Sequence, residues 1–409
     1  MKKRYLICLL TVFSTVCFAQ IKLVGIRSND PDPTVSIVKW DAFVPAVEEA
    51  FASTASTYLV GSSLMDANTS NYYFRSEFQL NAFNTQNDEY YIVQDETNFN
   101  GATQIDMSDG SIYAVFPEGQ IPDAPDPDSP YFSFVKLNTL DNSIVRVGTI
   151  TESITALPFS EGTCYNSDTS DYYFLGYDQS FQLHMYKSSL TNMNFSYSKI
   201  ALPVEPIAYY LSGLYFDIQS NKIVAVKSVF DDADQTNREI VQIDPVTGAF
   251  TTLYTFNNLV NLQNGSTTFD QNTRSYIAII FDQNFNRKLF VYNTLTNSAT
   301  ETTIPENVGE IQADNSSFAQ LRYSNLGNAS FDKNLVKVYP MPIKNNLTVE
   351  TLSDGFNTLS IYGIDGKVYG KESYNTSKMN LNVSNLPSGF YMLQLENKSG
   401  ILFRKLIKE

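Results

Sequence analysis

The sequence predicts an all-β protein in which a six-bladed β-propeller over residues 20–320 is followed by a small β-sandwich over residues 335–409. Three observations lead to this prediction. A motif recurs through the larger part of the chain, short alternating apolar runs are separated by turn residues, and the composition changes near Leu335. Repeats of roughly 40 to 50 residues that each hold several short strands are typical of propeller blades.

The repeat consists of a small residue, an apolar residue a few positions later, an Asp or Asn, and a new apolar run that begins six residues further on. The Asp or Asn position, here called the anchor, recurs at intervals of 40, 60, 51, 53 and 44 residues. These intervals favour propeller blades over helical solenoids. The anchors are Asp66, Asp106, Asn166, Asp217, Asp270 and, in a fainter copy, Asp314.

We interpret the anchors as turn residues rather than ligands. An Asp or Asn side chain can accept a hydrogen bond from the backbone two residues later, which suits it to the turn between the first two strands of a blade. A second alternating strand and a further turn follow, as in Glu239–Ile243 with Asp244–Gly248. Each unit therefore predicts a four-stranded antiparallel blade.

The two ends of the repeat region are expected to complete one blade together. The opening runs Ile21–Ile26 and Thr34–Trp40 lack an inner strand, whereas the copy at Ile311–Asp314 has an inner strand and little after it. Joining them closes the ring and removes exposed sheet edges. A different blade count or an open array stays an alternative, because strand boundaries are poorly defined by one sequence.

The first 19 residues have the pattern of a secretory signal peptide. Three basic residues precede the uncharged run Tyr5–Phe18, which is too short to span a bilayer. We expect cleavage between Ala19 and Gln20. A lipoprotein signal built on Cys17 is disfavoured because Val16 stands where such signals have a small residue. No later run is long enough for a transmembrane helix, so no transmembrane segment is predicted.

Charge is distributed unevenly along the chain. Residues 20–332 hold 15 basic and 37 acidic residues, a net of −22, whereas residues 333–409 hold ten basic and six acidic residues, a net of +4. An acidic body is repelled by phosphate groups, which argues against nucleic acid or an anionic membrane surface as a partner.

The C-terminal region carries a series of motifs in a fixed order, with strands that alternate and turns that contain Gly or Pro. The residues that carry the pattern are Tyr339, Pro340, Pro342, Asp365, Gly366, Leu386, Pro387, Gly389, Tyr391 and Lys405. Read physically, they predict a β-sandwich with a turn at Asp365 and Gly366. The region resembles the type A C-terminal sorting domain of type IX secretion system cargo. Met341 departs from the Asn that the family usually has at that position.

This resemblance implies a destination and two partners. Such domains are read by the type IX translocon of the outer membrane and are usually removed by a surface sortase. The protein is therefore expected to be secreted or held at the cell surface, by way of the periplasm. A linker is expected over residues 321–334, and the cut within the Ser- and Asn-rich stretch Asn315–Asp332.

Signals for enzymatic chemistry are sparse. His184 is the only histidine, so neither a multi-histidine metal centre nor a second histidine for proton transfer can exist. It lies in an alternating run and is expected to face solvent. Cys164 is the only cysteine after residue 19 and is interpreted as a small buried hydrophobe. No nucleophile elbow or phosphate-binding glycine loop is present. We expect most of the Tyr and Phe residues to fill the packing between blades.

No cofactor is predicted. Calcium is a possible ligand of three acidic clusters, at Asn29–Asp32, Asp123–Asp128 and Asp231–Asp234, because oxygen-rich loops bind this hard cation. None of the three has the spacing of a known calcium loop, so hairpin tips in solvent are the favoured interpretation.

The sequence thus favours a secreted or cell-surface propeller that acts as a non-enzymatic binding or adhesion module for a glycan or protein. The alternative is an extracellular hydrolase or lyase that acts on polysaccharide or peptide with paired carboxylates, which the sequence alone cannot choose among its acidic residues. The two differ in the channel they require. Buried carboxyls with raised pKa favour the enzyme, and a lining of Ser, Thr and Asn favours the binder.

Overall fold

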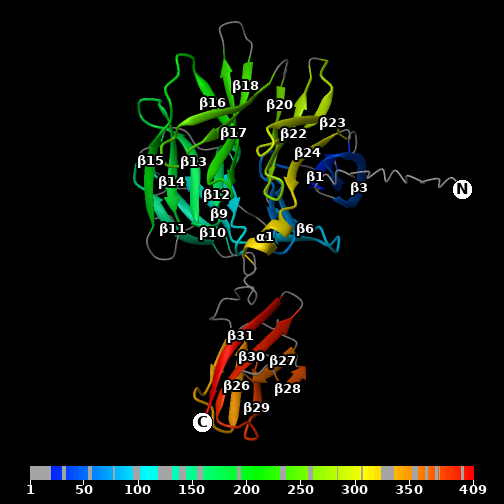
Figure 1. Cartoon of the computed structure of the whole chain (residues 1–409), viewed down its shortest axis with the longest axis vertical. Coiled ribbons are helices and arrows are strands. Elements are labelled where there is room, and N and C mark those ends of the chain that lie inside the picture. The colour runs from blue at the N-terminus through cyan, green and yellow to red at the C-terminus, as the bar shows by residue number, and fades with distance from the viewer. Residues whose placement is uncertain are drawn as a thin grey trace, which may run out of the picture.

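The computed structural model is all-β apart from one short α-helix and one 3-10 turn among its described residues (Figure 1). Those residues are 20–29, 34–53, 58–76, 79–94, 102–117, 131–137, 144–152, 154, 160–190, 195–230, 236–256, 261–282, 284–304, 307–323, 336–351, 358–363, 367–373, 376, 378–397 and 400–409. Within residues 22–313, the described strands form six antiparallel four-stranded sheets. The all-β propeller prediction is confirmed.

The first three sheets hold the strands nearest the N-terminus, together with one strand from the end of the repeat region. They are β24 (Val308–Ala313), β1 (Lys22–Ser28), β2 (Val35–Asp41), β3 (Val44–Ser53); β4 (Leu64–Asp66), β5 (Asn71–Arg75), β6 (Leu80–Asn84), β7 (Tyr90–Gln94); and β8 (Ala102–Ile105), β9 (Ile112–Pro117), β10 (Phe132–Leu137), β11 (Ile144–Ile150).

The other three sheets follow the chain without interruption. They are β12 (Thr163–Asn166), β13 (Asp171–Tyr177), β14 (Leu183–Ser189), β15 (Ser196–Ala201); β16 (Tyr209–Asp217), β17 (Lys222–Phe230), β18 (Thr236–Ile243), β19 (Phe250–Thr255); and β20 (Asn261–Asp270), β21 (Ser275–Phe281), β22 (Arg287–Asn293), β23 (Ser298–Thr303).

The first-named strand of each sheet faces a common centre. β24, β4, β8, β12, β16 and β20 contact one another in that cyclic order and return to β24. The ring closes where β24 pairs with β1, with Leu23 opposite Ala313. The predicted closure by N- and C-terminal strands is therefore confirmed. Because this sheet combines strands from both ends of the repeat region, it closes the ring between the first and the last repeat.

The anchors end the inner strands, as predicted. Each accepts a hydrogen bond from a backbone N–H two or three residues later, which shapes the turn into the next strand or, after Asp314, into the helix at Ser316–Tyr323. The donor–acceptor pairs are Asn68 to Asp66 (2.9 Å), Ser108 to Asp106 (2.8 Å), Asp168 to Asn166 (3.0 Å), Gln219 to Asp217 (3.2 Å), Thr273 to Asp270 (2.8 Å) and Ser316 to Asp314 (3.0 Å). Their interpretation as turn residues is confirmed.

Aromatic side chains fill the space between neighbouring sheets, as expected for large β-formers. Three tyrosines at equivalent positions of β5, β13 and β21 are fully buried and donate their hydroxyl to a carbonyl of the preceding inner strand. Tyr72 bonds Glu310 (2.5 Å), Tyr172 bonds Ala102 (2.7 Å) and Tyr276 bonds Gly213 (3.0 Å). Apolar area and a satisfied hydroxyl therefore hold these blades together.

Helix α1 (Ser316–Tyr323) directly follows the last inner strand. Phe318 belongs to a core cluster with Leu214 and Phe216 of β16. Arg322 forms a bidentate ion pair with Asp168, in which the Nε–Oδ1 distance is 2.8 Å. The helix is therefore anchored to the propeller and packs across the end of the ring where the anchors lie (Figure 1).

The C-terminal residues form two further sheets. One holds β25 (Val336–Tyr339), β26 (Asn346–Thr351) and β29 (Lys378–Asn382), and the other holds β28 (Val368–Ser373), β27 (Thr358–Gly363), β30 (Gly389–Asn397) and β31 (Gly400–Lys408). Leucines and isoleucines from both sheets share one core cluster, which includes Leu347, Leu381, Leu359 and Leu393. The predicted β-sandwich is confirmed.

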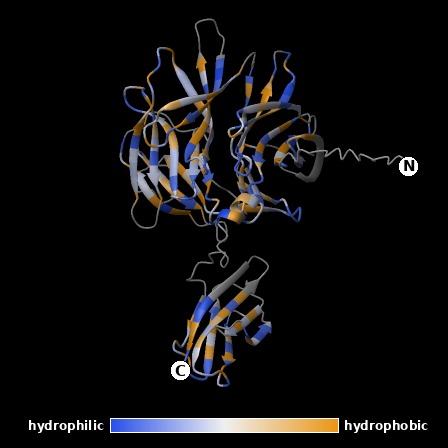
Figure 2. Cartoon of the chain, viewed as in Figure 1, coloured by the Kyte–Doolittle hydropathy of each residue, from blue (hydrophilic) through white to orange (hydrophobic). Residues whose placement is uncertain are grey.

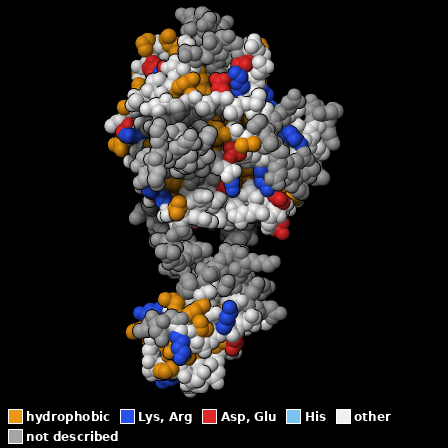
Figure 3. All heavy atoms as spheres, turned by 45° about the vertical axis from the view of Figure 1, so that its right-hand side comes forward, with side chains coloured by type: hydrophobic (Ala, Val, Ile, Leu, Met, Phe, Trp, Pro, Cys, Tyr) orange, Lys and Arg blue, Asp and Glu red, His pale blue; other side chains and the backbone are white. Residues whose placement is uncertain are grey.

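Apolar and polar residues alternate along many strands of the sheets (Figure 2). On the face drawn in Figure 3, the described acidic and basic side chains are scattered rather than gathered into one patch. None of the described helical segments has the length and apolar character needed to cross a membrane.

Candidate functional site

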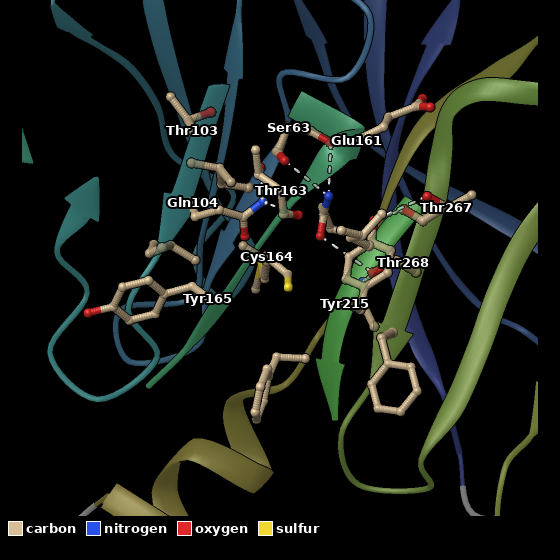
Figure 4. Close-up of a pocket in the computed structure, with 18 of the residues that line it drawn as sticks. Ser63, Thr103, Gln104, Glu161, Thr163, Cys164, Tyr165, Tyr215, Thr267 and Thr268 are labelled. Carbon is tan, nitrogen blue, oxygen red and sulfur yellow. Dashed lines mark hydrogen bonds between the residues drawn. The ribbon is translucent and has the colours of Figure 1, made fainter. Parts of the chain in front are cut away.

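A cavity of about 100 Å³ lies at the centre of the ring. Residues from all six inner strands or the loops that lead into them line it (Figure 4). Most of the polar lining consists of hydroxyl and amide side chains: Ser63, Thr103, Gln104, Thr163, Thr267, Thr268, Gln271, Gln312 and Asn315. Such a lining is the one that the sequence analysis associated with a binding channel.

Hydrogen bonds between neighbouring inner strands fix several of these groups. Gln312 donates from Nε2 to the Ser63 carbonyl (3.0 Å), and Gln104 donates to the Thr163 hydroxyl (2.9 Å). Thr268 donates to Gln312 Oε1 (3.4 Å), as the dashed lines in Figure 4 show. The lining is therefore preorganised, which lowers the entropy cost of holding a ligand.

One end of the cavity, here called the anchor end, lies toward α1, and Asn315, which directly precedes the helix, lines it. Asn315 donates to the Phe269 carbonyl (3.0 Å) and accepts from the Gln271 backbone (2.8 Å). Figure 4 shows the helix below the cavity. Polar groups at this end are paired with one another.

The opposite end, here called the glutamate end, holds two carboxyl groups. Glu161 lies in the 3-10 turn η2 (Ser160–Gly162) and lines the cavity, and Gly265 donates its backbone N–H to Glu161 Oε1. Glu310 lies in β24 and is 1% exposed. Its Oε1 accepts from the Gly61 N–H, and its Oε2 from the Ser63 N–H at 3.2 Å.

The backbone at this end is held in an unusual conformation. Glu310 has a φ of 49°, in the left-handed region, where blade-equivalent bulges of β16 and β20 place Gly213 (φ 60°) and Gly265 (φ 71°). A non-glycine residue there costs about 1–2 kcal/mol. The shift in register between β1 and β24 lies at the same point. A Cβ on Gly265 would lie 2.2 Å from Glu310 Oε1, so only glycine fits against this carboxyl.

Burial raises the pKa of both glutamates. The pKa of Glu161 rises to about 7 because burial disfavours its charged form. The pKa of Glu310 also rises to about 7, chiefly through burial, and the charge of Glu161 adds to the increase while the Gly61 and Ser63 donors oppose it. Among the described cavity-lining residues there is no Lys, Arg or His. The glutamate end therefore concentrates negative charge without a basic partner.

Glu161 and Glu310 were not among the residues predicted from the sequence to form a site. Both stand beside the small residue of the repeat, as Glu161–Gly162 and Gly309–Glu310. An acidic residue next to that glycine, on a strand that faces the centre of a ring, is the signal that could have identified them.

The solvent-facing prediction for His184 is wrong. Its side chain is 7% exposed, and Nε2 lies 2.9 Å from Asp178 Oδ2. Alternation along β14 does not separate core from solvent, because both faces of a blade are covered by neighbouring blades. Cys164 is 1% exposed, as predicted, and burial raises the pKa of its thiol, which disfavours a nucleophilic role.

The described sorting-motif residues lie on or near strands of the C-terminal sandwich. Tyr339 ends β25, with Pro340 and Pro342 directly after it. Leu386 and Tyr391 are buried, and the Tyr391 hydroxyl donates to the Pro387 carbonyl (2.9 Å). Gly389 begins β30, and Lys405 Nζ lies 4.3 Å from the centre of the Phe390 ring.

Several predicted features fall outside the described residues. They are the signal peptide with Ala19, the Asp365–Gly366 turn, Asp30–Asp32, and the acidic clusters 123–128 and 231–234. Among the described residues, no group of three or more His, Cys, Asp or Glu side chains could hold a metal ion.

Comparison with known families identifies the C-terminal region. Residues 337–409 match a family described as "Secretion system C-terminal sorting domain". The chain therefore carries a type IX sorting domain, which directs it to the cell surface or the extracellular space. No curated protein matches the chain by sequence.

Solved structures support the propeller. The chain is similar to TolB from Acinetobacter baumannii, with 13% identity, a TM-score of 0.51, and coverage of 72% of this chain and 66% of that one. It is also similar to a putative TolB from Agrobacterium tumefaciens (7% identity, TM-score 0.44, 69% and 89% covered) and to an oligogalacturonate lyase in complex with manganese (10%, 0.42, 66% and 71%). The first likeness shows a β-propeller fold, and these identities are too low to indicate an activity.

Proposed function

We propose that this secreted propeller is a binding module that holds a small ligand, or the end of a larger one, in its central channel without chemical turnover. The observation that carries the proposal is the preorganised lining of hydroxyl and amide groups, which come from the inner strands, or the residues beside them, of five of the six sheets. Such groups fix the orientation of a polar ligand through hydrogen bonds.

The size of the cavity supports a small occupant. A volume of about 100 Å³ has room for several waters or one small polar group. Pockets that enclose a drug-sized ligand measure roughly 300–1,000 Å³. A chain of sugars or a peptide would therefore insert only one end.

The proposal is tested by filling the cavity. Thr103 is 4% exposed and lines the channel, whereas Thr300 lies exposed on the outer strand β23. We expect small sugars and amines to raise the melting temperature of the wild type and of Thr300→Phe, but not of Thr103→Phe. Mass spectrometry should find no product. Equal stabilisation of Thr103→Phe by the same probes would contradict a ligand in the channel.

One observation favours the second candidate, a hydrolase or lyase: Glu161 and Glu310 have pKa values of about 7, which suits general acid or base catalysis near neutral pH. Binding is preferred because Glu310 is 1% exposed and both of its oxygens accept backbone hydrogen bonds. Product formation that is lost in Glu161→Gln would establish the enzyme instead.

Export and binding are proposed to reside in separate segments, with domain boundaries at residues 20–320, 321–334 and 335–409. Deletion of residues 335–409 should leave a folded propeller in the periplasm, because the matched sorting domain begins at residue 337. Cell fractionation measures this. Full extracellular recovery of the truncated protein would contradict the assignment.

A further inference from the structure

The charge and the hydrogen-bonding groups of the glutamate end indicate which class of ligand binds there. This inference rests on the proposed binding function. Glu161 lines the cavity, and Glu310 lies behind Gly61 and Gly265 at the same end. No Lys, Arg or His in the described parts of the chain forms an ion pair with either carboxyl. The buried carboxyl groups of this polar cavity therefore have no described basic side chain that balances their negative charge.

We infer that the glutamate end of the channel binds a primary ammonium group, such as that of an alkylamine, an amino sugar or a lysine side chain. Glu161 is its direct ion-pair partner, and Glu310 is a positioning residue whose charge strengthens the attraction. The hydroxyl groups of the channel face the rest of the ligand.

The hydrogen-bonding capacity of the site matches an ammonium group. An ammonium has three donors and no acceptor. Glu161 Oε1 accepts from Gly265, while no described residue hydrogen-bonds its Oε2, and hydroxyl groups such as that of Thr267 also line the cavity. A hydrogen-bonded ion pair inside a buried site is stronger than one at the surface.

A calcium ion fits less well. Calcium takes six to eight oxygen ligands, usually with several carboxylates. The described residues bring no group of three acidic side chains together, and two of the four carboxylate oxygens of the pair are bound to Gly61 and Ser63. The body of the chain is also strongly acidic, which attracts organic cations toward the propeller.

The strain at Glu310 is a second indication that its carboxyl serves a purpose. Glycine would adopt the same backbone without cost, as Gly213 does in β16. Instead, the left-handed φ of Glu310 directs a carboxyl to Gly61 and Gly265. Strain of this kind persists where the surrounding structure fixes a functional group.

Charged and titratable neighbours do not neutralise the pair. Tyr58, Tyr72 and Tyr215 lie near Glu310. Burial, together with the Glu310 charge, raises the pKa of all three, so they are neutral near pH 7. Tyr276 feels Glu161 and has a raised pKa as well. Arg287 is coupled to Tyr58 and donates to Gln263 (2.8 Å) rather than to a glutamate.

Ammonium binding therefore competes with protons. Both carboxyls have a pKa of about 7, so at lower pH they are protonated and neutral. Binding of a cation favours their ionised form, and the released protons pass to the buffer. Affinity for an amine should rise as the pH increases through 7.

Isothermal titration calorimetry of the mature full-length chain tests this inference with n-butylammonium as the probe. Its neutral and anionic counterparts are n-butanol and butyrate. We expect only n-butylammonium to bind, roughly tenfold more tightly at about pH 8.5 than at about pH 5.5, since its own pKa resembles that of lysine and its charge stays constant. Proton release should be visible as a dependence of the heat on the buffer.

The variants separate the roles of the two glutamates. Glu161→Gln should weaken binding at least roughly tenfold, which is the loss of one ion pair, while Glu161→Asp should retain part of it. Glu310→Gln should flatten the pH profile. The matched control is Glu301→Gln, because Glu301 is exposed on β23 and pairs with Lys288 (2.9 Å). Melting temperatures show whether each variant is folded.

The outcomes distinguish this inference from the proposed function. Unchanged amine affinity in folded Glu161→Gln, or equal binding of n-butanol, would overturn the ammonium site. If a neutral sugar binds the wild type but not Thr103→Phe, and n-butylammonium does not bind the wild type, the ammonium site is overturned while the binding module is supported. If neither amines nor sugars bind the wild type, both fail.

Discussion

Each end of the channel contains a buried carboxylate, and the two ends differ in the partners that surround it. At the anchor end, Asp217 is fully buried, yet it accepts hydrogen bonds from Gln219 and Ser220 and forms an ion pair with Arg274 (2.6 Å). At the glutamate end, Glu310 is equally buried and has backbone donors but no described cation. A buried carboxylate needs both hydrogen bonds and an opposite charge to be stable.

We interpret the paired carboxylate at the anchor end as structural and the carboxyl groups at the glutamate end as functional. At the anchor end, the buried Asp217 has both hydrogen-bond donors and a cation within the protein, so it needs no ligand to balance its charge. The glutamate end leaves charge uncompensated and keeps a strained backbone residue, Glu310. Native proteins retain such features mainly at functional sites.

The largest effect is expected from breaking the anchor-end ion pair. Asp217→Ala removes the turn hydrogen bonds and leaves Arg274 without its partner, so we expect a loss of about 3–5 kcal/mol in the free energy of unfolding. Asp244 makes equivalent turn bonds to Val246 and Thr247 but is partly exposed. Asp244→Ala, the control, should cost only about 1 kcal/mol. Urea denaturation measures both, and equal losses would contradict the special role of the buried pair.

The glutamate end should make stability depend on pH. Glu161 and Glu310 have folded pKa values of about 7, above the ordinary 4.5 of an unfolded glutamate. Their contribution is full below pH 4.5 and is lost as the pH rises through 7. The loss is up to roughly 3 kcal/mol for each group. Denaturation at several pH values should show this decline, and Glu310→Gln should reduce it. The same slope in Glu310→Gln and wild type would contradict the shift.

Glycine at the glutamate end should resist substitution. Gly265→Ala introduces a Cβ that would lie 2.2 Å from Glu310 Oε1, at a φ of 71°, so we expect a loss of about 1–3 kcal/mol. Gly370 of the sorting domain has open space around it, and Gly370→Ala should change stability by less than about 0.5 kcal/mol. Thermal melting compares the two. A neutral Gly265→Ala would show that the carboxyl has freedom to move.

The smallest effect is expected at His184, a buried polar group with a partner. Loss of its hydrogen bond to Asp178 in His184→Ala should lower the free energy of unfolding by about 1–2 kcal/mol. Amine affinity should stay unchanged, because His184 does not line the cavity. Calorimetry on the folded variant checks this, and a large loss of affinity would place His184 in the site.

The sequence by itself determined the β-propeller, the closure of its ring and the sorting domain, because these depend on local patterns. Turn formation at Asp66 or Asp217 needs only an Asp side chain and the backbone two residues later, and strand alternation is read directly from neighbouring residues. The pairing of Leu23 with Ala313 followed from an incomplete unit at each end.

Only the tertiary structure decided the site. Glu161 and Glu310 are 149 residues apart in the sequence, and their shared position arises because ring closure brings the loop before β12 and strand β24 to the same end of one channel. Burial and the missing cation, which set their pKa values, are properties of that environment and of no local pattern. His184 was misjudged for the same reason, since whether an alternating position faces water depends on which blade packs against it.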